Sequence, residues 1–253
     1  MDIKKIIDIH SHFNIGSPFD CRETVFHKRD FETMMSGYDL CKINVGAFSP
    51  FSAVLEGGES GIYRDNEYMF NFAAENPRIY QWVVLDPRQE ELFTQIRGMI
   101  DGDKVMGIKI HSPYHKYDID EYADRIFSFA DELGCFVLMH PDKIENMASY
   151  ADRYRNMKLI IAHLGSVEHV DAIANARYGN VFTDTSGGAS SNNSIIEYAV
   201  GRIGSEKIFF GTDTYSCGFQ RGRIEYAGIS DKDKENIFYN NAKKHFRRQF
   251  KDI

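Results

Sequence analysis

The sequence has few cysteines, no long apolar run and no extended basic stretch, and each absence narrows the class of protein. Its four cysteines are widely separated, with no Cys-x-x-Cys pair among Cys21, Cys41, Cys135 and Cys217. No segment approaches the length of a transmembrane helix, and the apolar residues near Met1 are too few for a signal peptide. We therefore expect a cytoplasmic protein with reduced thiols.

The charge pattern argues against nucleic acid as a partner. The formal net charge is −7 at pH 7, and the one dense basic group is formed by Lys243-Lys244 and Arg247-Arg248. That group is typical of a solvated helix end, where cations suit the helix dipole. We therefore expect no nucleic-acid partner, and the lack of a transmembrane segment predicts that the chain binds no membrane. The expected partner is a small-molecule substrate, and assembly into a homo-oligomer is left open.

The chain also lacks a linker, an internal repeat or a low-complexity tract, so we expect one domain over residues 1–253. Apolar runs typical of buried strands alternate with amphipathic segments throughout. The strand candidates are residues 6–9, 43–47, 79–85, 105–110, 136–139, 159–162, 181–183 and 208–210. The helix candidates lie near residues 30–40, 66–75, 89–100, 120–133, 144–155, 167–176 and 193–200. A last helix is predicted from residue 231 to about 250, with Ser230 and Asp233 spaced as a capping box.

Eight predicted strands, each followed by a helix, favour one α/β architecture. This is the parallel (β/α)8 TIM barrel, which we prefer to an open doubly wound sheet. The length of 253 residues is typical of such a barrel.

One segment between the second strand and the next helix is unusually irregular. Residues 48–64 show little periodicity and contain Pro50, Gly57-Gly58 and Gly61. In a barrel this segment lies on the face where active sites are built, so we predict a lid or a substrate-contacting loop.

Histidine and aspartate residues stand at the carboxyl ends of several predicted strands. His10 and His12 lie two residues apart at the end of the first strand, so their side chains point to the same side. His140 and His163 directly follow the fifth and sixth strands, and Asp213 closely follows the eighth. Because these ends meet at one mouth of a parallel barrel, we expect the side chains to converge.

The residue types in this set suit a catalytic metal. Imidazole nitrogens and a carboxylate oxygen suit Zn²⁺, Mn²⁺ or Fe²⁺, and the absence of cysteine disfavours a closed structural zinc site. A catalytic metal lowers the pKa of bound water and polarises a carbonyl. Lys109 lies inside or at the end of the fourth strand. If it faces the barrel interior, its ammonium needs a carboxylate, a ligand or a covalent modification.

Short motifs stand in order along nearly the whole chain. They are Asp8-Ile9-His10-Ser11-His12, Asn76-Pro77-Arg78, Leu85-Asp86-Pro87, Gly107-Ile108-Lys109-Ile110-His111, Ile161-Ala162-His163-Leu164-Gly165, Phe210-Gly211-Thr212-Asp213 and Asn241-Ala242-Lys243-Lys244-His245-Phe246. Together they resemble the amidohydrolase superfamily, specifically its amidohydrolase-related branch, which also contains metal-dependent decarboxylases.

This resemblance implies roles for the residues at the barrel mouth. The metal ligands that it implies are His10, His12, His140 and Asp213. His163 resembles the acid/base or substrate-polarising histidine, and Asp213 would be shared between the metal and the nucleophilic water. The sequence departs from the family where His140 is followed by Pro141-Asp142, and where no proline closely follows Asp213. Both departures lie at the substrate mouth, so they bear on the substrate rather than on the metal.

The remaining polar residues fall into two groups. Those at the predicted mouth are candidates for substrate binding only, namely His111, Tyr114, His115, Thr185, Ser186 and Tyr215. Three histidines lie on helix-like or loop segments away from the strand ends, and we predict that they are surface residues: His27, His169 and His245.

Two enzymatic functions fit this site. The first is a metal-dependent hydrolase that attacks an amide, lactam or lactone with a metal-activated water. The alternative is a metal-dependent nonoxidative decarboxylase or hydratase of the same fold that acts on a small carboxylic acid. A third, non-enzymatic alternative is a metal-binding or scaffold barrel. Lys109 resembles the carbamylated lysine of the hydrolytic branches, which favours hydrolysis.

Lys109 also decides how many metals the site holds. As a carbamate it would bridge two metals and draw His163 in as a ligand. As an ammonium it would pair with a substrate carboxylate or with an acid such as Asp184, and one metal would suffice. The ligand set is complete for one metal without Lys109, so we favour the ammonium. The expected cofactor is a divalent metal, first Zn²⁺, with Mn²⁺ or Fe²⁺ as alternatives.

Overall fold

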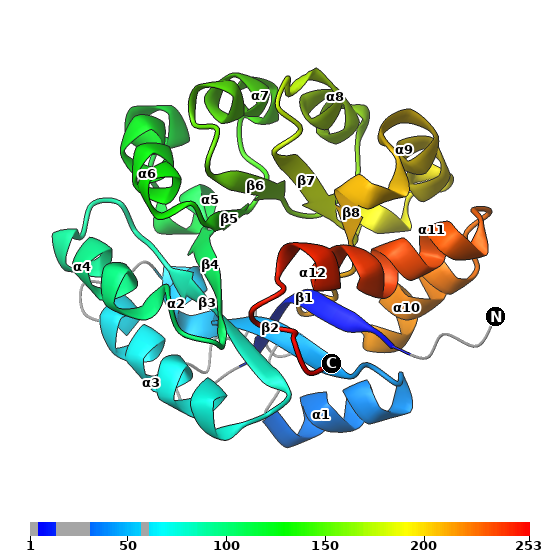
Figure 1. Cartoon of the computed structure of the whole chain (residues 1–253), viewed down its shortest axis with the longest axis horizontal. Helices are drawn as coiled ribbons and strands as arrows, with labels where there is room; N and C mark the ends of the chain where they lie inside the picture. Colours follow the sequence, from blue (N-terminus) through cyan, green and yellow to red (C-terminus); the bar gives the residue numbers. More distant parts are fainter. Residues whose placement is uncertain (1–4, 14–30, 57–60) are drawn as a thin grey trace.

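The computed structural model describes residues 5–13, 31–56 and 61–253. Within these ranges eight parallel strands form one sheet in which sequence neighbours are also spatial neighbours. The strands are β1 (Ile7–Phe13), β2 (Val45–Pro50), β3 (Ile79–Val84), β4 (Val105–Ile110), β5 (Phe136–Met139), β6 (Lys158–Ile161), β7 (Val181–Asp184) and β8 (Ile208–Phe209). The sheet curls into a barrel ringed by helices (Figure 1), which confirms the predicted single-domain (β/α)8 fold.

Backbone contacts between the first and last strands close the barrel. The Ile9 N–H donates to the Phe210 carbonyl at 2.9 Å, and Ser11 and Asp213 form an isolated parallel bridge. The Asp213 N–H also donates to the His10 carbonyl at 2.7 Å. The backbone itself therefore holds together the two segments that carry candidate metal ligands.

Helices pack around the outside of the barrel (Figure 1). They are α1 (Phe31–Leu40), α2 (Phe51–Glu56), α3 (Gly61–Glu75), α4 (Glu90–Met99), α5 (Ser112–His115), α6 (Ile119–Leu133), α7 (Ile144–Arg153), α8 (Val167–Asn175), α9 (Ile195–Ile203), α10 (Cys217–Glu225), α11 (Asp231–Glu235) and α12 (Asn241–His245). Each of the longer helices buries one apolar stripe, and in α6 that stripe includes Ala123, Ile126 and Phe127. Gly134 ends α6 in a left-handed conformation, which glycine adopts at low cost.

The barrel interior is filled at the end where the strands begin. Strands β2, β3 and β4 are buried along their whole length, as parallel strands are when side chains cover both faces. Aromatic side chains from the segment after α12 close this end, where Phe246 packs on Phe136 and Phe250 packs on Tyr80 at ring centroid distances of 4.4 and 4.7 Å. An open cavity can therefore lie only at the opposite end, where the strands finish.

Two sequence predictions about the first half of the chain are wrong in detail. β1 continues to Phe13 instead of ending at residue 9, so His10 and His12 lie within the strand. Much of the segment 48–64, predicted as a loop, is regular: it contains the end of β2, helix α2 and the start of α3. Residues 57–60 of that segment lie outside the described ranges.

The C-terminal helix differs from its prediction in length but not in its start. The capping box between Ser230 and Asp233 is present, as predicted. The helix then passes through a π-helical segment, Asn236–Asn240, into α12 and ends at His245 rather than near residue 250. Helices α5 and α10 were not predicted. In the described part of the chain, no helix is both long and apolar enough to cross a membrane.

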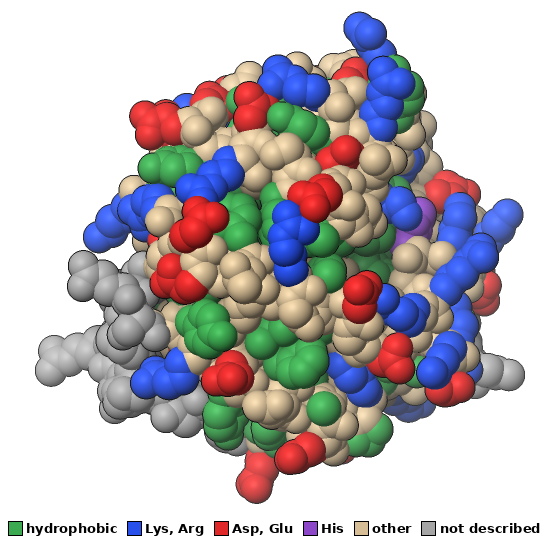
Figure 2. Space-filling model, turned by 60° about the vertical axis from the view of Figure 1, so that its left-hand side comes forward, with side chains coloured by type: hydrophobic (Ala, Val, Ile, Leu, Met, Phe, Trp, Pro, Cys, Tyr) green, Lys and Arg blue, Asp and Glu red, His purple; other side chains and the backbone are tan. Residues whose placement is uncertain are grey.

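Charged side chains of both signs are interspersed on the face shown in Figure 2. Several form exposed ion pairs between neighbouring helices, such as Arg97 with Glu132 at 2.7 Å and Arg153 with Asp124 at 2.5 Å. Pairs of this kind contribute little to stability. On this face the mixture of signs agrees with a sequence that contains one dense basic group and a net negative charge.

Candidate metal centre

His10 and His12 of β1 have the hydrogen-bond partners typical of metal ligands. The Nδ1–H of His10 donates to Asp184 Oδ2 at 2.8 Å, and that of His12 donates to the Ser49 carbonyl at 3.2 Å. Each Nε2 therefore carries the lone pair of its ring and is the atom that would bind a metal; on His10 this lone pair accepts a hydrogen bond from Lys109 Nζ at 2.9 Å, which a metal would displace. Burial lowers the pKa of both imidazoles well below its usual range, so both rings stay in the neutral form that binds metal.

Asp213 completes a compact donor group. Its Oδ1 lies 3.4 Å from His12 Nε2, and donor atoms of His10, His12 and Asp213 all lie within 4.8 Å of one another. Asp213 has a φ of 57°, a left-handed conformation that is uncommon outside glycine and recurs at functional sites. Burial raises the pKa of Asp213 to about 7, although Lys109 opposes the shift. A divalent metal would remove that penalty by binding the carboxylate.

This donor set fits a catalytic metal by its chemistry. Two neutral imidazoles and one carboxylate are three protein ligands that leave a position open for water or substrate. His140, the fourth predicted ligand, is not part of this group among the described residues. Its ring instead stacks on His111 at 4.0 Å and lies 5.0 Å from the ring of His163.

Asp8 supports the metal group from beneath. Its buried carboxylate accepts hydrogen bonds from the His10 N–H at 3.0 Å, the Thr212 N–H at 3.1 Å and the Tyr38 hydroxyl at 2.6 Å. Burial raises the pKa of Asp8 to about 7 against the effect of these donors. Asp8 thus joins β1, α1 and the segment after β8, and fixes the relative position of His10 and Asp213.

A second cluster of donor atoms gathers around the hydroxyl of Ser186. The hydroxyl donates to Asp184 Oδ1 and accepts from His163 Nδ1 at 2.9 Å. The N–H groups of Ser186 and His163 also donate to Asp184 Oδ1, at 2.8 and 3.2 Å. Donor atoms of His10, His163 and Asp184 lie within 4.8 Å of one another because of this network. Because Nδ1 of His163 donates to the Ser186 hydroxyl, the neutral ring carries its lone pair on Nε2.

Lys109 extends from β4 into the same end of the barrel, which is one of the two orientations that the sequence left open. The residue is 1% exposed, and its Nζ donates to His10 Nε2 at 2.9 Å. Burial lowers the pKa of Lys109 to about 8, although Asp213 and Asp184 favour the charged form. Asp184, suggested from the sequence as its partner, is bonded to His10 and Ser186 instead.

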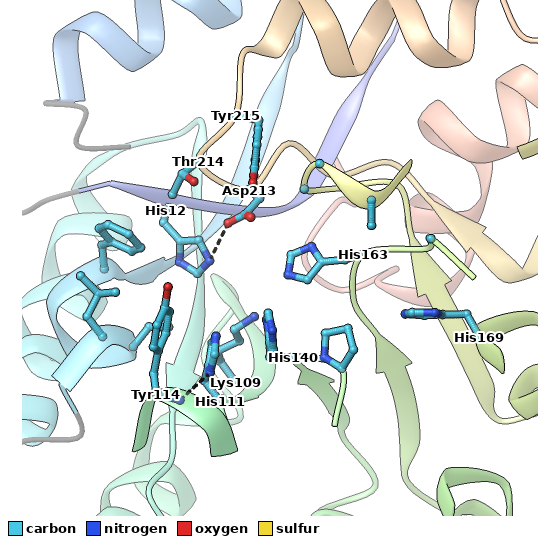
Figure 3. Close-up of a pocket in the computed structure, with 18 of the residues that line it drawn as sticks. His12, Lys109, His111, Tyr114, His140, His163, His169, Asp213, Thr214 and Tyr215 are labelled. Atoms are coloured by element: carbon cyan, nitrogen blue, oxygen red, sulfur yellow. Dashed lines mark hydrogen bonds and ion pairs between the residues drawn. The ribbon is translucent and has the colours of Figure 1, made fainter. Parts of the chain in front are cut away.

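A cavity of about 820 Å³ opens above these residues. Figure 3 shows His12, Asp213, His163 and Lys109 directed into it. The outer wall is more apolar and includes Phe51, Val54, Leu55, Tyr114, Pro141 and Tyr215. Three of these residues belong to the segment 48–64, which therefore lines the cavity, although the segment is helical there rather than a loop.

Other sequence predictions about the cavity hold only in part. His111, Tyr114 and Tyr215 line it, as predicted. His115, Thr185 and Ser186 are buried beside it and bond to protein groups; His115, for example, donates to the Ala53 carbonyl at 2.9 Å.

Two of the three histidines predicted to lie on the surface do not. His169 is 5% exposed, lines the cavity and donates to the Ala162 carbonyl at 3.0 Å. His245 is half-buried against Phe136 and Phe182 at the closed end of the barrel. Both predictions rested on the distance of each histidine from the strand ends, which does not tell which face of its helix meets the barrel. His27 lies outside the described residues.

The barrel and its candidate metal site are compatible with a metal-dependent enzyme, and comparison with family models identifies the family. Residues 7–248 match the family model described as Amidohydrolase. The chain therefore belongs to the amidohydrolase family, as its motifs predicted. Comparison with curated proteins finds no match.

Solved structures share the fold along nearly the whole chain. 5-Carboxyvanillate decarboxylase from Sphingomonas paucimobilis is 13% identical, with a TM-score of 0.77 and coverage of 96% of this chain and 99% of that chain. A dihydroxybenzoic acid decarboxylase from a Polaromonas species, solved with manganese, is 14% identical, with a TM-score of 0.75 and coverage of 96% and 97%. 4-Oxalomesaconate hydratase from Rhodopseudomonas palustris is 13% identical, with a TM-score of 0.68 and coverage of 96% of each chain. At these sequence identities the comparison shows that this chain and the three enzymes share the barrel fold.

Proposed function

We propose that the protein is a metal-dependent nonoxidative decarboxylase that acts on a small carboxylic acid. One observation carries this proposal: a metal-capable group with a single carboxylate, Asp213, lies beside a separate buried cation, Lys109. A divalent ion with one carboxylate ligand keeps positive charge, and the ammonium adds to it. The cavity floor therefore favours an anionic substrate over a neutral amide or lactone.

The metal would be held by His10, His12 and Asp213, with His140 on the neighbouring wall. When bound, a divalent metal supplies Lewis-acid polarisation of a substrate oxygen. The Nδ1 bonds of His10 and His12 keep both rings in the orientation and tautomer that this ligation requires. Manganese in a structure of similar fold supports Mn²⁺ as a candidate beside the Zn²⁺ that the sequence suggested.

The other two residues of the floor have distinct roles in this proposal. Lys109 pairs with the substrate carboxylate, so that burial of the anion is compensated by a cation. His163 moves the proton, because Ser186 leaves its Nε2 as the basic atom. In the reaction the bond between carbon and the carboxylate breaks, CO₂ leaves, and the electron pair left on carbon takes a proton. His163 Nε2 accepts that proton from a substrate hydroxyl or water and delivers it to the carbon.

The hydrolase that the sequence favoured is the weaker candidate. A carbamylated Lys109 would bridge two metals and recruit His163 to the second one. Of the atoms that could form such a second group, His163 Nδ1 and Asp184 Oδ1 are engaged with Ser186, and Asp184 Oδ2 is engaged with His10, which leaves His163 Nε2 alone. The decarboxylase is further supported by the presence of decarboxylases among the proteins of similar fold.

Release of CO₂ tests this proposal. Metal-free protein is loaded with Mn²⁺ or Zn²⁺ and incubated with 5-carboxyvanillate, 2,6-dihydroxybenzoate and benzoate, in parallel with simple amides and lactones. We expect metal-dependent CO₂ release from an acid, and its loss in the charge-removing variant Lys109→Met. Hydrolysis of an amide or lactone, with no CO₂ released from any acid, would overturn the proposal.

A further inference from the structure

His111 is held in one tautomer by the first turn of α5. It directly precedes this helix, and the backbone N–H of Tyr114 donates to His111 Nδ1 at 3.1 Å. A backbone N–H can only donate, so Nδ1 must be the accepting nitrogen of the ring. In the neutral imidazole the proton then resides on Nε2. His111 is thus the reverse of His163, whose proton lies on Nδ1.

Two neighbouring rings fix the plane of His111. Tyr114 stacks on it with a centroid distance of 4.2 Å and an interplanar angle of 21°, and His140 stacks on it at 4.0 Å and 17°. Two rings at these distances cannot share one face, so they cover opposite faces. Figure 3 shows the three rings side by side, with His111 in the middle. Only the edge of its imidazole is left to meet the cavity.

That edge carries a hydrogen-bond donor. Nδ1 is occupied by the Tyr114 amide, so Nε2–H is the polar group that remains. His111 is 5% exposed and lines the cavity together with Lys109 and His163. Within the described ranges, no side chain or carbonyl accepts a hydrogen bond from Nε2. Because His111 lines the cavity, a ligand oxygen bound there can accept this hydrogen bond.

We propose that His111 is a substrate-binding residue whose Nε2–H donates a hydrogen bond to an unprotonated substrate oxygen. For the carboxylic acid this rests on the proposed function, whereas the tautomer rests on the structure alone. A donor of fixed direction selects ligands that present an acceptor at this position and disfavours those that present a donor. His111 would therefore determine which acids the cavity accepts.

Two variants separate this role from that of a helix cap. In His111→Asn the side-chain oxygen can stand in for Nδ1 and keep the bond to the Tyr114 amide, but the distal donor is lost. In His111→Gln the amide N–H can reach the place of Nε2, but the cap is lost. The probe is 2,6-dihydroxybenzoate, and its dissociation constant is measured by calorimetry with the metal-loaded protein, alongside metal content and thermal unfolding.

We expect His111→Asn to weaken binding of the probe roughly 10- to 100-fold, the usual effect of losing a hydrogen bond to a charged group. His111→Gln should bind it more tightly than His111→Asn does. Metal content should be unchanged in both variants. The opposite order, or loss of metal in His111→Asn, would show that His111 only supports α5 or His140 and would overturn the proposal.

Nitrogen-15 NMR of the histidine rings in the ligand-free protein makes the test independent of the proposed function. We expect His111 to carry its proton on Nε2 at neutral pH. A proton on Nδ1, or on both nitrogens, would overturn the inference whatever ligands bind. If no acid binds the wild-type protein, the proposed decarboxylase fails while this measurement still decides the state of His111.

Discussion

Replacement of Gly187 with alanine is expected to impair catalysis without emptying the metal site. Gly187 has a φ of +73°, a left-handed conformation that costs other residues roughly 1–2 kcal/mol. A methyl group there would lie 2.6 Å from His163 Nδ1, well inside van der Waals contact. The imidazole would have to move by roughly 1 Å. This movement would break the bond between His163 and Ser186 that keeps Nε2 basic.

A displacement of about 1 Å at a reacting group can lower turnover roughly 100-fold. The free energy of unfolding should fall by about 1–2 kcal/mol from the backbone strain. Metal content should stay at the wild-type level. The three atoms nearest to the added methyl group all belong to His163, and none belongs to His12 or Asp213.

Gly188→Ala is the matched control. Gly188 has a φ of −74°, which alanine adopts without strain, and its added methyl group would lie 3.4 Å from the Tyr215 hydroxyl. The assay measures turnover, metal content and urea unfolding of both variants side by side. Equal turnover in Gly187→Ala and Gly188→Ala, at equal metal content, would refute the role of the Ser186–His163 contact.

Three further predictions concern separate parts of the molecule. His163→Asn should lower turnover by about 10²–10⁴-fold at unchanged metal content, measured by metal analysis beside kinetics; a loss of metal would contradict this. Tyr38→Phe removes the hydroxyl that donates to Asp8 and should cost about 1–3 kcal/mol of unfolding free energy in urea, whereas the exposed Tyr226→Phe should cost almost nothing. Burial, aided by nearby cations, lowers the pKa of His245 to about 4, so the unfolded chain binds its proton first as the pH falls below about 6.5. As the pH falls between these values, the free energy of unfolding should decrease by up to about 1 kcal/mol per pH unit because of His245. His245→Phe should reduce this dependence of stability on pH. An unchanged dependence in the variant would show that His245 is not its cause.

The barrel could be predicted because its signals are local. Each parallel strand is buried on both faces and reads as a short apolar run, and each helix between them has a stripe of its own. The strand-end positions of His10, His12, His163 and Asp213 follow from that order alone. Their convergence is then a property of every parallel barrel rather than of this sequence.

The hydrogen-bond network around the site could not be predicted because its partners are distant in the chain. His10 and Asp184 are separated by 174 residues, and no local sequence pattern indicates that the Asp184 carboxylate accepts a hydrogen bond from His10. The tautomers of His111 and His163 depend on such partners. Two errors did have a local signal: Ser112-Pro113 marks the start of α5, and His169 shares helix spacing with the buried Ala172 and Ile173.

The proposed function depends on one divalent metal, held by His10, His12 and Asp213, beside an unmodified Lys109. Anomalous diffraction at the manganese edge from crystals of the Mn²⁺-loaded protein tests it most directly. We expect one anomalous peak per chain within reach of His10 Nε2, His12 Nε2 and an Asp213 carboxylate oxygen, with an unbranched Lys109 side chain. Two peaks bridged by a carbamylated Lys109, with His163 as a ligand of the second metal, would contradict it.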